Sequence, residues 1–157
     1  MQALDSIFYF CKLALAWSIH IKKNRLGSVY QVRDNEVFTV FRETVSDANY
    51  LENEVTLVVG FRLKLIKKNA FFHFLFQRVC ILNTPIWVGF KGFKTKLWMV
   101  DAISKNYLGI YRYQGRENAE GYAEYITSIL RPFSTKGSIW FEIIDTKFEN
   151  YIKKIVK

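Results

Sequence analysis

The sequence predicts an α+β protein built on one antiparallel sheet. Segments whose apolar residues alternate with the two-residue period of a strand are interspersed with segments of helical period. From residue 54 onward these segments follow the order strand, helix, strand, strand, helix, strand. The chain has 157 residues, of which 50% are hydrophobic and 17% aromatic, and this is enough to close a single core.

Residues 1–53 are predicted to form an N-terminal extension packed on the rest of the chain. Residues 7–21 (IFYFCKLALAWSIHI) carry the apolar stripe of a helix. Two β-branched and aromatic runs, 28–33 and 36–45, flank an Asp-Asn pair, which is typical of a β-hairpin.

Residues 54–157 are expected to form the main domain. The predicted elements, in chain order, are a strand at 54–66, a helix at 67–83, strands at 93–101 and 107–114, a helix at 116–131 and a strand at 138–144. The helix at 67–83 ends before Pro85 and the helix at 116–131 ends before Pro132, because proline disfavours continuation of a helix. Asp145 is expected to cap a terminal helix.

The order βαββαβ predicts a ferredoxin-like fold, in which a four-stranded antiparallel sheet carries both helices on one side. Alternation divides the strand residues between two layers. The layer expected to face the helices contains Leu57, Phe61, Thr95, Leu97, Met99, Leu108, Ile110, Ile139, Phe141 and Ile143. The opposite layer is expected to contain Val58, Arg62, Lys64, Lys94, Lys96, Trp98, Val100, Tyr107, Tyr111, Tyr113, Trp140, Glu142 and Ile144.

The opposite layer holds more apolar area than a monomer usually leaves in water. A second copy of the chain, the N-terminal extension or a nucleic acid would cover it. A homodimer formed through this sheet face is the favoured prediction.

Charge and cysteine content restrict partners and compartment. Lys and Arg total 23 against 14 Asp and Glu, so the net charge of +9 favours acidic partners, although the basic residues are scattered as on a solvated surface. Two cysteines, Cys11 and Cys80, form no disulfide framework, so a cytoplasmic location is expected. Residues 7–21 are too short to span a membrane, but a helix within residues 1–24 that lies on a membrane surface is an alternative to packing on the domain.

The sequence lacks the motifs of zinc proteolysis, thiol redox chemistry, α/β-hydrolases and nucleotide-binding loops, and no metal or cofactor is predicted. The candidate base is His73, within FFHFLF, where burial would keep the imidazole neutral. A neutral imidazole beside an apolar site can take a phenolic proton. The alternative is a structural histidine on a helix.

Two glycines suggest a binding hollow. Gly60 and Gly109 are expected in one layer on the two central strands, leaving a space flanked by Arg62, Trp98 and Tyr111. Such a space suits a flat aromatic ligand whose acidic group meets the arginine. The alternative is close packing of strands or of two subunits.

Three segments carry a family resemblance: TPIWVGFKGFKTKLWMVD, YLGIYRYQGRENAEGYAEYI and GSIWFEII. They resemble the YdhR-like mono-oxygenase proteins of the dimeric α+β barrel superfamily, which also holds the antibiotic-biosynthesis mono-oxygenases. The resemblance covers residues 54 to about 145 and implies dimerisation through apposed sheets. Haem degradation, known in one branch, is disfavoured because the Asn and His of that branch have no counterpart here.

The sequence therefore predicts a homodimeric α+β barrel protein that binds a small apolar or aromatic molecule, with cofactor-independent mono-oxygenation as its enzymatic form. His73 and Tyr111 are the candidate catalytic residues. The candidate ligand-binding residues are Gly60, Arg62, Trp87, Trp98 and Gly109. Two alternatives stay open: a non-catalytic binding or structural homodimer with a peripheral membrane helix, and an RNA-binding module that stacks bases on the aromatic layer.

Overall fold

The computed structural model describes most of the chain from residue 19 onward. The described residues are 4, 8, 11, 19–32, 36–47, 53–64, 69, 71, 74–78, 88–147 and 151–156. His73, Trp87 and Cys80 lie outside them.

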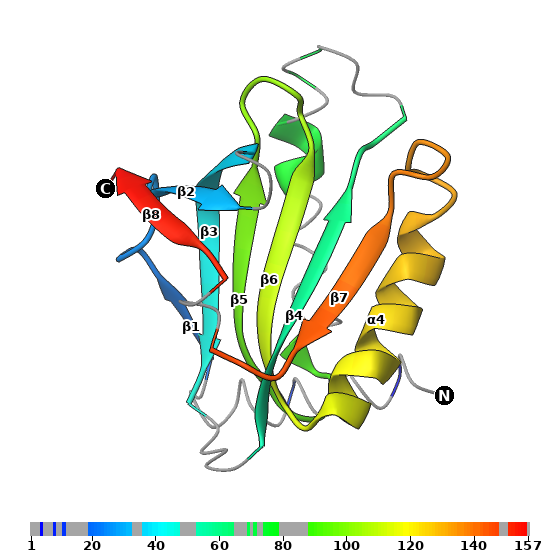
Figure 1. The fold of residues 1–157 in the computed structure, drawn as a ribbon. Helices are drawn as coiled ribbons and strands as arrows, with labels where there is room; N and C mark the ends of the chain where they lie inside the picture. The colour runs from blue at the N-terminus through cyan, green and yellow to red at the C-terminus, as the bar shows by residue number, and fades with distance from the viewer. Residues whose placement is uncertain are drawn as a thin grey trace.

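The described strands form one eight-stranded antiparallel sheet (Figure 1). Its strands are β1 Ile19–Lys22, β2 Val29–Val32, β3 Glu36–Ser46, β4 Glu54–Phe61, β5 Phe93–Val100, β6 Tyr107–Gln114, β7 Trp140–Ile144 and β8 Lys153–Val156. Seven strands follow the order β7-β4-β6-β5-β3-β2-β8, and β1 pairs with β3.

The centre of this sheet has the predicted ferredoxin-like α+β arrangement. The strand order β7-β4-β6-β5 places the first and third strands of the βαββαβ unit in the middle. Helix α4, Arg116–Leu130, connects β6 to β7 and packs against the sheet through Ala119, Tyr122, Ala123 and Ile126. Residues 71 and 74–78, between β4 and β5, are also helical.

The sheet has more strands than the four expected. The predicted hairpin is present as β2 and β3, but β3 pairs with β5 and thereby extends the central sheet. In a four-stranded sheet β5 would be an edge strand with unpaired backbone N–H and C=O groups. The long strand β3, which is rich in β-branched residues, forms hydrogen bonds with these groups.

Two terminal predictions are wrong in their details. Residues 153–156, expected within a terminal helix, form β8 and pair with β2, because their β-branched Ile155 and Val156 suit a strand beside an open edge. Residues 19–21, expected at the end of the first helix, belong to β1 and pair with β3. Residues 8 and 11 are helical, as expected, and residue 4, which precedes the predicted helix, is helical as well.

The layer assignment is correct for β4 and wrong for β5 and β6. Leu57 pairs with Tyr111, and Val58 pairs with Ile110. Directly paired residues share a face, so the aromatic side chains of β6 lie on the α4 side and the aliphatic ones on the far side. A shift of one residue in register exchanges all side chains between the two faces, and alternation within one strand does not reveal it.

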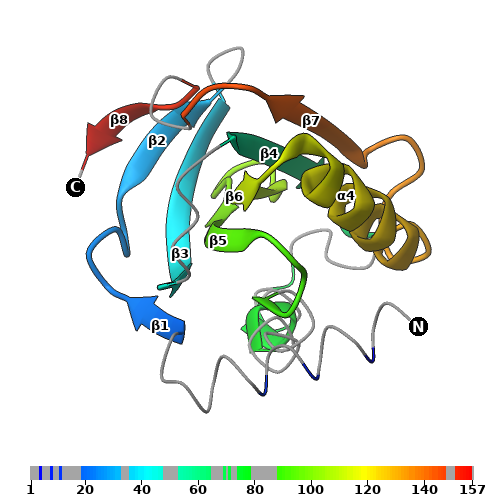
Figure 2. The same ribbon diagram turned by 90° about the horizontal axis from the view of Figure 1, so that it is seen from below.

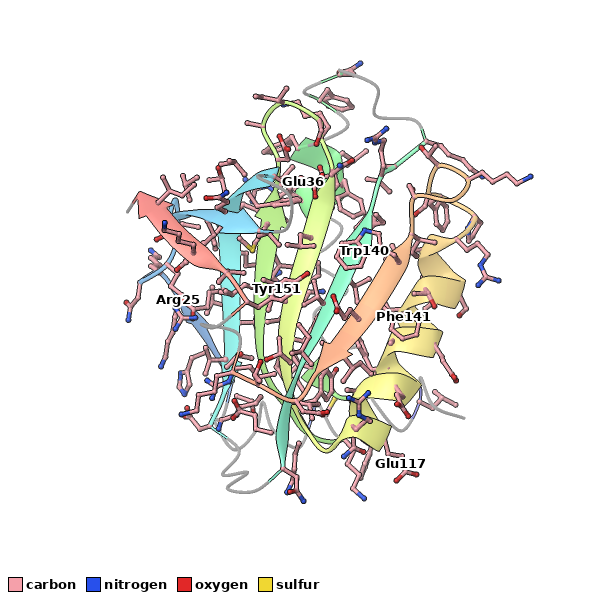
Figure 3. All side chains as sticks on the ribbon, viewed as in Figure 1. Arg25, Glu36, Glu117, Trp140, Phe141 and Tyr151 are labelled. Carbon is pink, nitrogen blue, oxygen red and sulfur yellow. The ribbon has the colours of Figure 1, made fainter. Side chains whose placement is uncertain are left out.

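The far face is buried within the single chain. Its cluster combines the aliphatic residues of the central strands with residues of the hairpin and of the C-terminal segment. The cluster consists of Tyr30, Val32, Phe38, Val40, Val58, Leu97, Met99, Leu108, Ile110 and Ile152, with Trp140, Ile144 and Tyr151 packed against it. Figure 2 shows how the sheet curls to bring β2 and β8 around this face, and Figure 3 shows Trp140 and Tyr151 over it.

Of the covers considered for the sheet, the chain's own N-terminal extension contributes to this face through its hairpin, together with the C-terminal segment. Formation of a homodimer stays a prediction. In the described part of the chain, no helix combines the length and apolarity needed to cross a membrane.

Candidate functional site

The sheet face that meets α4 carries a buried group of aromatic and cationic side chains, which we call the aromatic–cation cluster. Its members are Arg42, Thr44, Lys96, Trp98, Tyr111, Tyr113 and Tyr122. They come from β3, β5, β6 and α4.

Strand register brings the cluster together in two neighbouring rows. In one row, Arg42 of β3 pairs with Trp98 of β5, and Trp98 pairs with Gly109 of β6. In the next row, Thr44 pairs with Lys96, and Lys96 pairs with Tyr111. Because successive residues on one face of a strand are two apart, these rows are direct neighbours.

Two cations lie against the indole of Trp98. The Lys96 Nζ is 3.0 Å from the Trp98 ring centroid and 4.6 Å from the Tyr111 ring centroid. The Arg42 Cζ is 6.0 Å from the Trp98 centroid. Lys96 is only 3% exposed and Arg42 7% exposed. Cation–π attraction is strengthened by such burial and reaches about 2 kcal/mol.

Three tyrosines continue the aromatic surface toward α4. The Tyr122 hydroxyl donates a hydrogen bond to the Tyr111 hydroxyl oxygen at 3.2 Å, and the Tyr113 and Tyr122 rings stack at 5.4 Å between centroids. Burial, with a smaller contribution from Tyr111, raises the pKa of Tyr113 well above its ordinary value. The Tyr113 hydroxyl therefore stays protonated and able to donate.

Two hydroxyls of the cluster have no hydrogen-bond partner. They are the Tyr113 hydroxyl and the Thr44 Oγ1, and both are inaccessible to solvent. Buried hydroxyls are nearly always paired, because leaving one unpaired costs about 1–3 kcal/mol. Polar groups that face a buried site without a partner are suited to binding a ligand that supplies one.

The hollow expected between two glycines is not formed. Val59 pairs with Gly109 and Gly60 with Leu108, so the two glycines face opposite sides of the sheet. The ring of Tyr111 occupies the space over Gly109, where an added Cβ would be 2.7 Å from the nearest ring carbon. The indole of Trp140 fills the space over Gly60. Both glycines allow an aromatic ring to approach the backbone closely.

The other predicted site residues are distributed as follows. Trp98 and Tyr111 lie in the cluster. Arg62 is exposed, and its Nε donates a hydrogen bond to Asn106 Oδ1 at 2.8 Å, outside the cluster. The roles assigned to His73 and Trp87 stay predictions, because neither residue is described.

Sequence reasoning missed five residues of the cluster as ligand-site residues: Arg42, Thr44, Lys96, Tyr113 and Tyr122. Lys96 and Tyr113 were expected on the same sheet face as Trp98 and Tyr111, but they were not assigned to the ligand site. Arg42 and Thr44 belong to β3, whose pairing with β5 was not expected. Tyr122 was recognisable as part of the apolar face of its helix, but not as a hydroxyl donor to Tyr111. Among the described residues, no group of three His, Cys, Asp or Glu is arranged to hold a metal ion.

Comparison with known proteins identifies similar folds but no family. No family model matches the chain, and no curated protein matches it significantly. A solved structure described as a major regulator of staphylococcal pathogenesis aligns with a TM-score of 0.52 and 12% identity, over 74% of this chain and 72% of that one.

Two further solved structures are described as relatives of mono-oxygenases. An uncharacterised ferredoxin-fold protein related to antibiotic biosynthesis monooxygenases, from Listeria monocytogenes, aligns with a TM-score of 0.45 and 11% identity, over 80% of this chain and 90% of that one. A monooxygenase-like protein from Listeria innocua aligns with a TM-score of 0.44 and 12% identity, over 71% of this chain and 64% of that one. At these identities and TM-scores the two likenesses carry no argument about this chain, and its chemistry has to be argued from its own residues.

Proposed function

We propose that the protein binds a small planar, apolar or aromatic molecule at the aromatic–cation cluster. The observation that carries this proposal is the convergence of Trp98 and three tyrosines with two buried cations on one sheet face. Ligand sites are mostly apolar and aromatic, with a few polar groups that fix orientation. The unpaired hydroxyls of Thr44 and Tyr113 supply such groups here.

If the protein converts the molecule that it binds, the reaction that we propose is cofactor-independent mono-oxygenation. In such a reaction a CH₂ group of an aromatic substrate becomes C=O, one atom of O₂ enters the product, and the other leaves as water with both hydrogens. The hydrogen-bonded hydroxyls of Tyr111 and Tyr122 support this form, because such a pair can pass a proton within a buried site. His73 remains the proposed base.

The RNA-binding alternative is not favoured by this geometry. Base stacking requires aromatic rings on an open sheet face. Trp98, Tyr111 and Tyr113 are buried on the α4 side instead, and the far face carries aliphatic residues covered by the chain itself.

Calorimetric titration with 2-naphthol and anthrone tests the binding proposal. We expect Trp98→Leu to weaken binding by about tenfold, which corresponds to about 1.4 kcal/mol. Trp140→Leu is the matched control, because Trp140 packs over Gly60 on the far face and should leave affinity unchanged. Absence of binding to the wild type, or equal loss in both variants, would contradict the proposal. Oxygen consumption with anthrone tests the enzymatic form separately.

A further inference from the structure

We infer that the ligand of this site is an anion, with a carboxylate or phenolate oxygen that contacts Lys96 and Thr44 while its ring lies against Trp98. The inference rests on the proposed function and narrows its substrate class. It does not use Arg62, which the sequence suggested for the acidic group and which lies outside the cluster.

The positions of three groups define where the oxyanion would lie. Thr44 and Lys96 are a directly paired couple on adjacent strands, so their side chains leave the sheet side by side on one face. The ammonium of Lys96 lies over Trp98 and reaches toward Tyr111. An oxyanion attached to an aromatic ring can therefore meet the ammonium and the hydroxyl while the ring contacts the indole.

Burial makes this contact strong and selective. Lys96 is almost fully buried and Thr44 is 1% exposed, so a charged contact here is little screened by water. Hydrogen bonds to an ionised oxygen are about twice as strong as those between neutral groups. A neutral ligand of the same shape would gain no charged contact from Lys96.

The unpaired hydroxyl of Thr44 is a second, independent indication. Its Oγ1 is buried and has no hydrogen-bond partner, and Thr44 is the register partner of Lys96 on the adjacent strand. A hydroxyl can donate one hydrogen bond to a carboxylate or phenolate oxygen. An anion held by Lys96 would give this hydroxyl the acceptor that the chain does not provide.

The charged members of the cluster are both cationic. They are Arg42 and Lys96. The neighbouring acidic residue of β3, Glu43, pairs with Leu97, whose side chain belongs to the far-face cluster. The net charge of +9 adds a long-range attraction for anions.

Calorimetric titration with 2-naphthoate and 2-naphthylmethanol measures how the negative charge of the ligand affects affinity, because the two compounds share the naphthalene ring and only the first is an anion. We expect the wild type to bind 2-naphthoate at least tenfold more tightly. Lys96→Met should remove this preference and retain binding of 2-naphthylmethanol. Lys94→Met is the matched control: it removes the same charge from the same strand, at a side chain bonded to Glu54, and should keep the preference.

Thr44→Val provides a second test that does not depend on how Lys96→Met folds. The substitution removes an unpaired hydroxyl, so the free protein should fold normally while its preference for 2-naphthoate falls several-fold. Equal wild-type affinities for both compounds, or a preference that survives in Thr44→Val, would overturn the inference and leave the proposed function standing. Failure of the wild type to bind either compound would overturn both.

Discussion

At the residue scale, Gly109 shows how a missing side chain shapes the cluster. The ring of Tyr111 lies where a Cβ on Gly109 would be, with the nearest ring carbon 2.7 Å and the hydroxyl oxygen 2.8 Å away. Gly109→Ala should therefore displace the ring and lower the free energy of unfolding by about 1–3 kcal/mol, as overpacking does in other cores. Denaturation in urea measures this change.

Gly121 offers a matched control for that substitution. It lies within α4, and a Cβ built on it meets nothing within 4 Å. Gly121→Ala should raise the free energy of unfolding by up to about 1 kcal/mol, because alanine favours the helix. If Gly109→Ala stabilised the protein as much as Gly121→Ala, the close approach of Tyr111 would be disproved.

The buried hydroxyl pair allows a second test at this scale. Removal of either hydroxyl, in Tyr111→Phe or Tyr122→Phe, takes away the hydrogen bond between the two residues and should cost about 1–2 kcal/mol. The double variant should cost less than the sum of the single variants, because it removes both partners together. Additive losses in a double-mutant cycle would show that the two hydroxyls do not interact.

At the element scale, one carboxylate holds three strands together. Glu54 of β4 forms ion pairs with Arg112 of β6 and with Lys94 of β5, the latter at 2.8 Å. Burial raises the pKa of Glu54, but the hydrogen bonds and charges of Arg112 and Lys94 outweigh it and hold the pKa below its ordinary value.

This depressed pKa predicts a loss of stability in acid. A carboxyl group with a lower pKa in the folded state stabilises the protein fully above the unfolded-state pKa, and this contribution is lost as the pH falls through the folded-state pKa. The free energy of unfolding should therefore fall as the pH drops below about 4.5. Glu54→Gln should have a lower free energy of unfolding at neutral pH, and this free energy should fall less steeply below about pH 4.5 than in the wild type. An equally steep fall in both proteins, measured by urea denaturation at several pH values, would contradict this role of Glu54.

The residues that lead into β8 provide a second element-scale prediction. Ile152 is 7% exposed and packs in the far-face cluster, whereas Ile155, within β8, is 50% exposed. Ile152→Ala should lower the free energy of unfolding by about 2–4 kcal/mol, while Ile155→Ala should change it by less than about 1 kcal/mol. Equal effects of the two substitutions would mean that the C-terminal segment does not cover the far face.

The elements were predictable where the signal is local. The sequence placed β5, β6 and α4 within one residue of their observed bounds, because each has its own periodicity and its own turn or proline signals. It placed the start of β4 correctly but extended the strand to residue 66, whereas β4 ends at Phe61. The extra pairing of β3 with β5 and the strand β8 were missed. Both depend on an open sheet edge supplied by a distant part of the chain, and no local pattern encodes that edge.

The candidate site was predictable only in part. Alternation correctly grouped Lys96, Trp98, Tyr111 and Tyr113 on one face, but it assigned that face to the wrong side of the sheet, since the side depends on register between strands. Arg42 and Thr44 could not be found before β3 was paired with β5.

At the scale of the whole molecule, one chain gives its sheet two different buried faces. On the far face the central strands carry aliphatic side chains, and the chain's own hairpin and C-terminal segment cover them. The face toward α4 is aromatic and carries buried cations and unpaired hydroxyls. An apolar face closed in this way contributes stability, whereas the polar groups on the other face cost stability unless they have partners. This asymmetry is the reason to place binding on the α4 side.

The crystal structure of the protein in complex with 2-naphthoate tests this account most directly. We expect the naphthalene ring against Trp98 and the carboxylate within hydrogen-bond distance of Lys96 Nζ and Thr44 Oγ1. A ligand bound on the far face, or at the surface beside Arg62, would contradict the account.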